Sequence, residues 1–224
     1  MPPEFERSYF EERASYGARG GYAAMLGQAR AFYAEYFRIA AGFLDDFERG
    51  TGRTALEVGC AFGAGSDLLQ RMGYDVVATD VSAYACERAR ELLPPHVLVR
   101  RIDLETEGAS LGTFDLVACI QVIEHVPGKA FLRALCDRVA PGGALVIATP
   151  NPRSVSPYRS FQADPTHVNE RPPQAWIESL RANGMTIAGA GTYHVIPVVH
   201  RWLGIRLLRS PVWLGYDTVI VARR

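Results

Sequence analysis

The chain has 224 residues, of which 48% are hydrophobic and 21% are charged. These are ordinary globular proportions, so the composition excludes a fibrous or largely disordered chain. The 24 basic and 24 acidic side chains cancel, so no overall positive field attracts nucleic acid or an anionic membrane. The length suits one domain with additions, and we expect residues 1–224 to form a single domain.

Residues 1–50 are predicted to form a helical N-terminal extension, because apolar side chains recur at helical spacing between residues 22 and 48. The extension is rich in aromatic residues: Tyr9, Phe10, Tyr16, Tyr22, Phe32, Tyr33, Tyr36 and Phe37. Two interpretations of these side chains stay open. Either they form a lid over a ligand site, or those after Tyr22 belong to the hydrophobic core.

Residues 54–192 alternate between short apolar runs and stretches with helical periodicity. The apolar runs predict strands at residues 55–58, 75–79, 97–100, 114–119 and 144–148. The stretches between them predict helices at residues 65–72, 83–92 and 129–139. Nearly continuous apolar strands separated by helices are typical of a parallel sheet that is covered on both faces. The predicted fold class is therefore α/β, with a doubly wound sheet.

The C-terminal part of the chain adds a helix at residues 172–183, a strand at 186–190 and a last strand at 217–222, within 216–224. The prediction is thus a mostly parallel, seven-stranded, Rossmann-like sheet. Residues 193–215 form an apolar and basic insert before the last strand. Prolines at positions 197 and 211 argue against one long amphipathic helix there. We expect the insert to be a lid, with an interface or a membrane contact as alternatives.

A turn of small residues follows the first strand, in the run Glu57-Val58-Gly59-Cys60-Ala61-Phe62-Gly63. Small residues let a ligand approach the backbone, and the N–H groups of the following helix point at that ligand. The glycine spacing differs from the G-x-G-x-x-G of dinucleotide oxidoreductases. Asp80 and Asp103 end the second and third strands at the same edge of the sheet. An acid at Asp80 suits the hydroxyls of a ribose, although it also suits a helix cap.

This ordered set, together with Phe114-Asp115-Leu116-Val117 and Pro141-Gly142-Gly143, resembles the successive motifs of class I S-adenosylmethionine-dependent methyltransferases. The resemblance covers residues 56–184. It implies that S-adenosylmethionine is the cofactor, that the turn holds its methionine moiety, and that Asp80 and Asp103 bind its ribose and adenine. It also implies that Gln121 lies beside the methyl group. Residues implied to bind the cofactor are Glu57, Gly59, Cys60, Ala61, Gly63, Asp80, Val81, Asp103, Leu104, Gln121 and Val122. Ala61 departs from the family, which most often has glycine there.

Two histidines follow the carboxyl ends of predicted strands, His125 after the fourth and His167 after the fifth. Ligands of open α/β sheets bind at this edge, and a histidine near its ordinary pKa can take a proton from a hydroxyl. We expect His125 and His167 to be the catalytic residues. For His125, a structural role in ordering the loop with Glu124 is the alternative.

A metal site is a separate question. Some relatives, the small-RNA 2′-O-methyltransferases and the ubiquinone-pathway O-methyltransferases, hold a divalent ion with an E-x-x-E-H motif. This chain has Gln121 in place of the first glutamate, which removes a ligand that hard cations prefer. We therefore expect no metal ligands, while noting that Glu124, His125 and His167 can still meet.

The resemblance implies a methyltransferase that acts on a hydroxyl of a small molecule, such as a sugar or a natural product. An RNA ribose 2′-O-methyltransferase and a non-catalytic methyltransferase-like scaffold are the alternatives. The sequence predicts no nucleic-acid partner and no membrane span, and it allows a homodimer. The start of the chain, Pro2-Pro3-Glu4-Phe5-Glu6-Arg7, does not resemble a signal peptide. The four cysteines form no C-x-x-C pair, so we expect reduced thiols and a cytoplasmic location.

Overall fold

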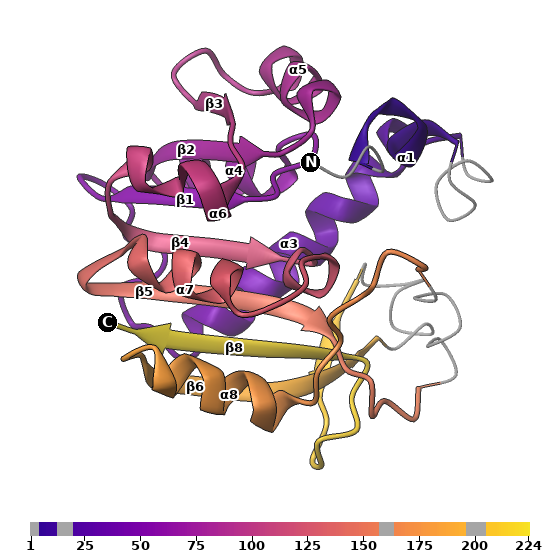
Figure 1. Cartoon of the computed structure of the whole chain (residues 1–224), viewed down its shortest axis with the longest axis vertical. Coiled ribbons are helices and arrows are strands. Elements are labelled where there is room, and N and C mark those ends of the chain that lie inside the picture. The colour runs from indigo at the N-terminus through magenta and orange to yellow at the C-terminus, as the bar shows by residue number, and fades with distance from the viewer. Residues whose placement is uncertain (1–4, 13–19, 157–163, 196–204) are drawn as a thin grey trace.

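A computed structural model describes residues 5–12, 20–156, 164–195 and 205–224. They form an eight-stranded sheet with the order β3-β2-β1-β4-β5-β8-β6-β7 (Figure 1). The strands are β1 (Thr54–Val58), β2 (Asp75–Asp80), β3 (Leu98–Arg101), β4 (Phe114–Ile120), β5 (Val139–Pro150), β6 (Thr186–Val195), β7 (Leu207–Arg209) and β8 (Asp217–Arg223). The helices are α1 (Arg7–Glu11), α3 (Leu26–Ala41), α4 (Ala64–Arg71), α5 (Ala83–Leu92), α6 (Leu104–Glu107), α7 (Ala130–Asp137) and α8 (Pro173–Ala182). Short 3-10 turns are η2 (Ala23–Met25), η3 (Gly108–Leu111) and η4 (Ile123–His125).

The direction of the strands decides where a ligand can bind. Strands β1 to β5 are parallel, whereas β8 runs antiparallel between β5 and β6. Asp217, the first residue of β8, pairs with Pro150, the last residue of β5. The start of β8 therefore lies at the edge where the parallel strands end, which is the ligand-binding edge of such sheets.

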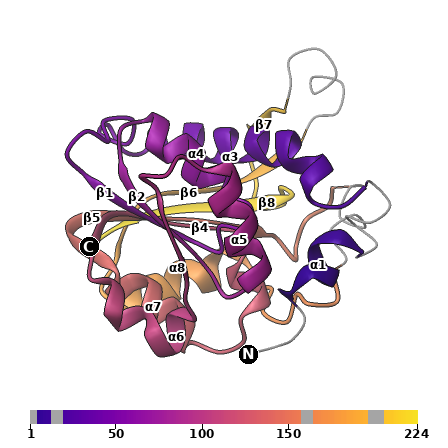
Figure 2. The same ribbon diagram turned by 90° about the horizontal axis from the view of Figure 1, so that it is seen from above.

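Helices cover both faces of the sheet (Figure 2). Helices α3, α4 and α5 contribute buried residues to the apolar cluster on one face, and α7 and α8 contribute to the cluster on the other. Helix α3 forms because its apolar residues recur every three or four positions, so that Tyr33, Tyr36, Phe37 and Ala40 share one buried stripe. The side chains of Phe37 and Trp176 are 1% exposed and anchor the two faces.

The predicted fold class is confirmed, with one addition to the sheet. Residues 207–209 of the insert pair with β6 as the edge strand β7, so the sheet has eight strands rather than seven. The predicted helix at 129–139 ends at Asp137, because Val139 already pairs with Phe114 in the sheet. Trp202 and residue 197 of the insert lie outside the described residues, and its role as a lid stays a prediction.

The cysteines behave as the sequence predicts: Cys60, Cys86, Cys119 and Cys136 are all buried and free of disulfides. Across the described ranges, every helix is too short or too polar to cross a membrane.

Candidate active site

A cavity of about 350 Å³ opens at the carboxyl edge of the parallel strands. Its floor consists of the ends of β1, β2 and β4 and the start of β8, and α1, η2 and α3 supply its aromatic walls. Of the residues predicted from the sequence, those that line it are Gly59, Ala61, Asp80, Val81, Leu104, Gln121, Val122 and His125. Glu57, Cys60, Gly63, Asp103 and His167 do not line it.

The turn after β1 is built from left-handed backbone. Gly59, Ala61 and Gly63 have φ angles of +73°, +46° and +84°. A Cβ atom on Gly59 would lie 2.3 Å from Cγ2 of Val122, so only glycine lets the two loops at the cavity floor pack together. Ala61 adopts the same left-handed region with a Cβ atom, which costs free energy.

Asp80 is held rigidly at the end of β2. Its two carboxylate oxygens accept hydrogen bonds from the backbone N–H groups of Ala61 and Ser82, each at 2.9 Å. Burial raises the pKa of the Asp80 carboxyl, and these backbone hydrogen bonds oppose that effect. Because both oxygens are fixed and the side chain lines the cavity, Asp80 presents an oriented acceptor to a ligand that carries hydroxyl groups.

Glu57 lies beneath the turn instead of facing the cavity. Its side chain is fully buried, and it accepts a hydrogen bond from the Ser66 hydroxyl in α4. Burial raises the pKa of Glu57 to about 7. A Cβ atom on Gly65 would collide with Glu57 and Tyr33. Glu57 thus ties β1 to the start of α4 and supports the turn from below.

Asp103 lies beside the main cavity. Its carboxylate accepts a hydrogen bond from the Glu105 N–H at 3.0 Å and so caps α6. Asp103 and Val81 line a neighbouring hollow, and the next residue, Leu104, lines the main cavity. Val81 belongs to both spaces, so a ligand that crosses Val81 can reach Asp103.

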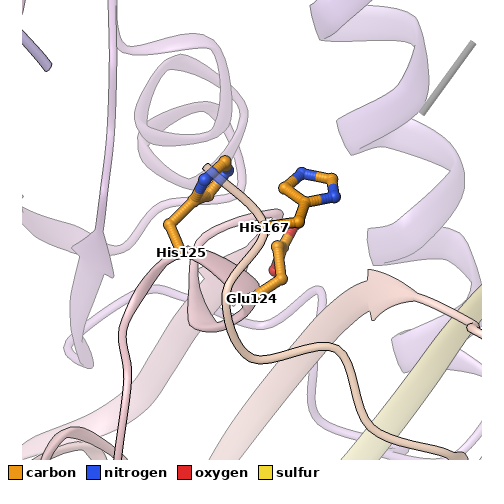
Figure 3. Close-up of side chains that lie close together, drawn as sticks. All are labelled: Glu124, His125 and His167. Carbon is orange, nitrogen blue, oxygen red and sulfur yellow. The ribbon is translucent and has the colours of Figure 1, made fainter. Parts of the chain in front are cut away.

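The two predicted catalytic histidines lie together. The ring centroids of His125 and His167 are 4.7 Å apart, and Figure 3 shows both rings beside Glu124. Glu124 and His125 belong to η4, whereas His167 belongs to the loop before α8. The N–H groups of Val168 and Asn169 donate to the backbone carbonyl of Glu124 at 3.0 and 2.9 Å, which fixes that loop against η4.

Hydrogen bonds orient both imidazole rings. The Thr166 hydroxyl donates to Asp164 at 2.5 Å, and the same oxygen lies 2.8 Å from Nδ1 of His125. Because that oxygen has used its hydrogen, Nδ1 of His125 is the donor, so the lone pair of a neutral ring would be on Nε2. Nδ1 of His167 lies 2.9 Å from a carboxylate oxygen of Glu170 and donates to it, since a carboxylate only accepts.

Glu124 completes a group that can hold a metal ion. One ligand atom from each of Glu124, His125 and His167 lies within 4.8 Å of the others. Burial raises the pKa of Glu124 to about 8, and its buried Oε1 has no hydrogen-bond partner. Two imidazoles and a carboxylate suit a transition-metal ion. Gln121, which replaces the first glutamate of the E-x-x-E-H motif, directs its amide nitrogen toward Tyr36 and Asp217.

Tyr36, Gln121 and Asp217 form a polar cluster that sequence reasoning missed. The Tyr36 hydroxyl donates to Oδ2 of Asp217 at 2.6 Å. The Gln121 amide nitrogen donates to the Tyr36 oxygen and to Oδ1 of Asp217, both at 3.1 Å. Asp217 could have been predicted, because the first residue of an antiparallel strand next to β5 lies at the ligand-binding edge. Tyr36 could not, since its helical spacing equally indicates core.

The aromatic side chains of the N-terminal extension divide between the hydrophobic core and the lining of the cavity, and a role as a lid stays a prediction. Tyr33 and Tyr36 belong to the buried core and also line the cavity, whereas Phe37 is core alone. Phe5 and Tyr9 line the cavity and contact the His125 ring edge-on, with centroids 5.5 and 6.3 Å away. The extension therefore forms one wall of the cavity.

The model of one family of methyltransferase domains matches residues 28–189 of this chain. The chain belongs to that family, and its fold is that of the class I S-adenosylmethionine-dependent methyltransferases.

Three known proteins illustrate this relationship. The 2-methyl-6-phytyl-1,4-hydroquinone methyltransferase of Synechocystis sp. is 30% identical over 78% of this chain and 60% of its own length. The mitochondrial ubiquinone biosynthesis O-methyltransferase of Schizosaccharomyces pombe is 39% identical over 44% of this chain and 38% of its own length. The chain thus spans 60% or less of either relative. The crystal structure of magnesium protoporphyrin IX methyltransferase from Synechocystis, with bound S-adenosylmethionine, shares the fold. It has a TM-score of 0.61 and 18% identity over 87% of this chain and 80% of that chain.

Proposed function

We propose that this protein transfers the methyl group of S-adenosylmethionine to a hydroxyl of a small-molecule acceptor. The observation that carries the proposal is the composition of one cavity, which joins Asp80 and the turn after β1 to His125. Asp80 and the turn after β1 are suited to a ribose and an amino-acid moiety. His125 offers a base within the same cavity.

The residues of the chain divide the work of binding. Asp80 accepts hydrogen bonds from the ribose hydroxyls, and Val81 and Leu104 contact the adenine, with Asp103 reaching its amine from the neighbouring hollow. Gly59 and Ala61 bring the backbone close to the methionine moiety, over the support that Glu57 gives from below. When bound, S-adenosylmethionine supplies an electrophilic methyl group on its sulfonium sulfur.

His125 is the base in this proposal. Its Nδ1 donates to Thr166, so Nε2 carries the lone pair that accepts the proton of the acceptor hydroxyl. Transfer of the methyl group to the acceptor oxygen would release the hydroxyl proton, and Nε2 of His125 would take it. His167 packs against the His125 ring and, with Glu170, keeps it in place. Holding the nucleophile in line with the methyl group supplies most of the rate, since a positioned base adds about 10²- to 10⁴-fold.

Hydroxylated natural products and sugars are the acceptors that we propose. Two relatives are named for methylating a hydroquinone and for O-methylation in ubiquinone biosynthesis, which supports a hydroxylated ring. An RNA ribose is the second candidate, but the neutral net charge does not favour a polyanion. A cytoplasmic location and a homodimer stay predictions.

The test is a calorimetric titration with S-adenosylhomocysteine, with and without a chelator, followed by an acceptor screen. We expect micromolar binding that does not depend on the chelator. Failure of a folded sample to bind would overturn the enzymatic proposal and favour the scaffold alternative. An acceptor reaction that stops with the chelator would show that the reaction needs a metal ion, for which Glu124, His125 and His167 are the candidate ligands.

A further inference from the structure

The orientation of the His125 ring decides which of its two nitrogens can act as a base. The edges of Phe5, Tyr9 and His167 pack against the ring, with centroids 5.5, 6.3 and 4.7 Å away. Figure 3 shows the rings of His125 and His167 side by side. Such contacts fix the plane of an imidazole, but a half-turn about its Cβ–Cγ bond exchanges nitrogen for carbon with little change in packing. A polar contact therefore has to select one of the two orientations.

The hydroxyl of Thr166 makes a contact of that kind. Its oxygen lies 2.8 Å from Nδ1 of His125. Thr166 is 9% exposed, so water has little access to this hydrogen bond. The hydroxyl donates its own hydrogen to Oδ1 of Asp164 at 2.5 Å. The Thr166 oxygen therefore accepts from the ring, and a neutral ring in this orientation can take up a proton only at Nε2.

A tight turn at residues 164–167 carries the Thr166 hydroxyl to the histidine. The His167 N–H donates to the Asp164 carbonyl at 2.9 Å. This bond closes a β-turn with Pro165 at its second position, where the fixed φ of proline is favourable. The Thr166 N–H donates to Oδ1 of Asp164 at 2.8 Å. Two backbone N–H groups thus hold the turn, so its shape does not depend on the Thr166 hydroxyl alone.

The loop after this turn is fastened to η4, the 3-10 turn that carries His125. The Asn169 side-chain amide donates to the carbonyls of Ile123 and Val126 at 3.3 and 2.7 Å. Two backbone N–H groups of the loop also donate to a carbonyl of η4. These bonds hold the loop against η4 without using the Thr166 hydroxyl. The position of the loop and the orientation of the ring can therefore be tested separately.

We propose that Thr166 is a positioning residue, which turns the His125 ring so that Nδ1 donates and Nε2 is the site of proton uptake. A free neutral imidazole prefers its hydrogen on Nε2, and in a protein the hydrogen bond at one nitrogen decides which of the two carries it. When Nε2 takes the acceptor's hydroxyl proton, the ring becomes an imidazolium and its Nδ1–H stays bonded to Thr166. The proposal rests on the proposed function and adds to it the residue that prepares the base.

Nitrogen NMR of the histidine rings tests the proposal without requiring turnover. The protein is saturated with S-adenosylhomocysteine at pH 9, where an ordinary imidazole is neutral, and a chelator keeps metal ions off the rings. Among the five histidines, His125 is assigned from the signals that disappear in His125→Asn. We expect Nδ1 of His125 to carry the hydrogen. A hydrogen on Nε2 overturns the proposal.

Thr166→Val keeps the shape of the side chain and removes the hydroxyl. We expect the ratio of Nδ1–H to Nε2–H forms of His125 to fall by at least about fivefold, the effect of losing one buried hydrogen bond. Thr166→Ser keeps the hydroxyl, so its ratio should stay within about twofold of that of the unchanged protein. Thr166→Ala replaces Thr166→Val if the latter fails to fold. An unchanged ratio without the hydroxyl, or no recovery with serine, overturns the proposal.

The matched control is Thr54→Val, at the opposite end of β1 from the cavity. Like Thr166, Thr54 donates both its N–H and its hydroxyl to one aspartate oxygen, Oδ2 of Asp115, at 2.8 and 3.1 Å. The His125 ratio should be unchanged in this variant. A fall equal to that in Thr166→Val overturns the proposal. In Thr166→Val, unchanged amide signals of residues 168 and 169 are expected, because the loop stays on η4. Loss of those signals together with the ratio would show that Thr166 is structural and overturn the proposal.

The same samples separate this proposal from the proposed function. If S-adenosylhomocysteine does not bind, the methyltransferase proposal fails. If it binds and the His125 ratio does not respond to the Thr166 hydroxyl, only the role of Thr166 fails.

Discussion

Two parts of the cavity are built in different ways: the proposed cofactor half, around Asp80 and the turn after β1, and the proposed acceptor half, around Tyr36, Gln121 and Asp217. The cofactor half consists of short local turns, in which Asp80 accepts from the N–H groups of Ala61 and Ser82, 19 and 2 residues away. The acceptor half joins distant parts of the chain, since Tyr36 and Asp217 are 181 residues apart. One half is a repeated strand–turn–helix unit, and the other exists only through the tertiary fold.

This difference has a physical consequence for specificity. A local turn keeps its shape when distant loops vary, so the cofactor half can be retained while the acceptor half changes. The acceptor half depends on the register of β8 and on the packing of α3. Substitutions in the two halves are therefore expected to affect different measured quantities.

The largest expected effect is on turnover, from substitutions at the two histidines. His125→Ala removes the proposed base, and we expect kcat to fall by about 10²-fold or more while S-adenosylhomocysteine affinity stays unchanged. His167→Ala should lower kcat less, because His167 acts by holding His125. The measurement is steady-state kinetics with an acceptor from the screen. Unchanged kcat in both variants would remove the base from the mechanism.

Asp80→Ala is the corresponding test of the cofactor half. We expect S-adenosylhomocysteine to bind at least about tenfold more weakly, since a buried charged hydrogen-bond partner is lost. Asp75→Ala changes the exposed first residue of the same strand and should leave the affinity unchanged. Calorimetry decides between them, and equal affinities for both variants would contradict the ribose assignment.

Glu124→Gln tests the buried carboxyl beneath the two histidines through the pH dependence of stability. Burial raises the folded-state pKa of Glu124 from 4.5 to about 8. Between these values the folded protein binds a proton that the unfolded chain releases, so stability falls as pH rises through this window. We expect Glu124→Gln to be more stable than the unchanged protein at pH 8, and to lose less stability between pH 5 and pH 8.

Thermal unfolding with a chelator present measures this effect. In a chain of this size, Tm shifts by about 2–4 °C for each kcal/mol of change in the free energy of unfolding. The control is Glu91→Gln, whose carboxylate is exposed on α5. Parallel pH profiles for Glu124→Gln and the unchanged protein would show that Glu124 is not proton-bound when folded.

The smallest expected effect is that of Ala61→Gly in the turn. Ala61 has left-handed backbone at φ +46°, and glycine relieves that strain while adding entropy to the unfolded chain. We expect a net gain of at most about 1 kcal/mol. Ala85→Gly, in right-handed helix α5, should lose about 1 kcal/mol instead. A loss of stability in Ala61→Gly equal to that of the control would refute the strain.

The sequence predicts the cofactor half better than the acceptor half, for the same physical reason. Strand ends and turns are local, so Gly59 and Asp80 could be placed at one sheet edge from the pattern of strands, whereas the place of Gln121 beside the cofactor was implied by the family resemblance. Glu57 and Cys60 share the motif, but the strand pleat and the turn direct them away from the cavity. Tyr36 could not be assigned, because a helix stripe does not show which of its members reaches past the core to a cavity.

Strand β8 also affects how the chain assembles during synthesis. It lies between β5 and β6, yet it is made after both, so β6 and β7 cannot join the sheet until β8 emerges from the ribosome. Until then β5 and β6 have unpaired edges rich in apolar residues, and such edges promote aggregation. The carboxylate of Asp217 arrives with this late strand, so its hydrogen bonds with Tyr36 and Gln121 cannot form before β8 is made.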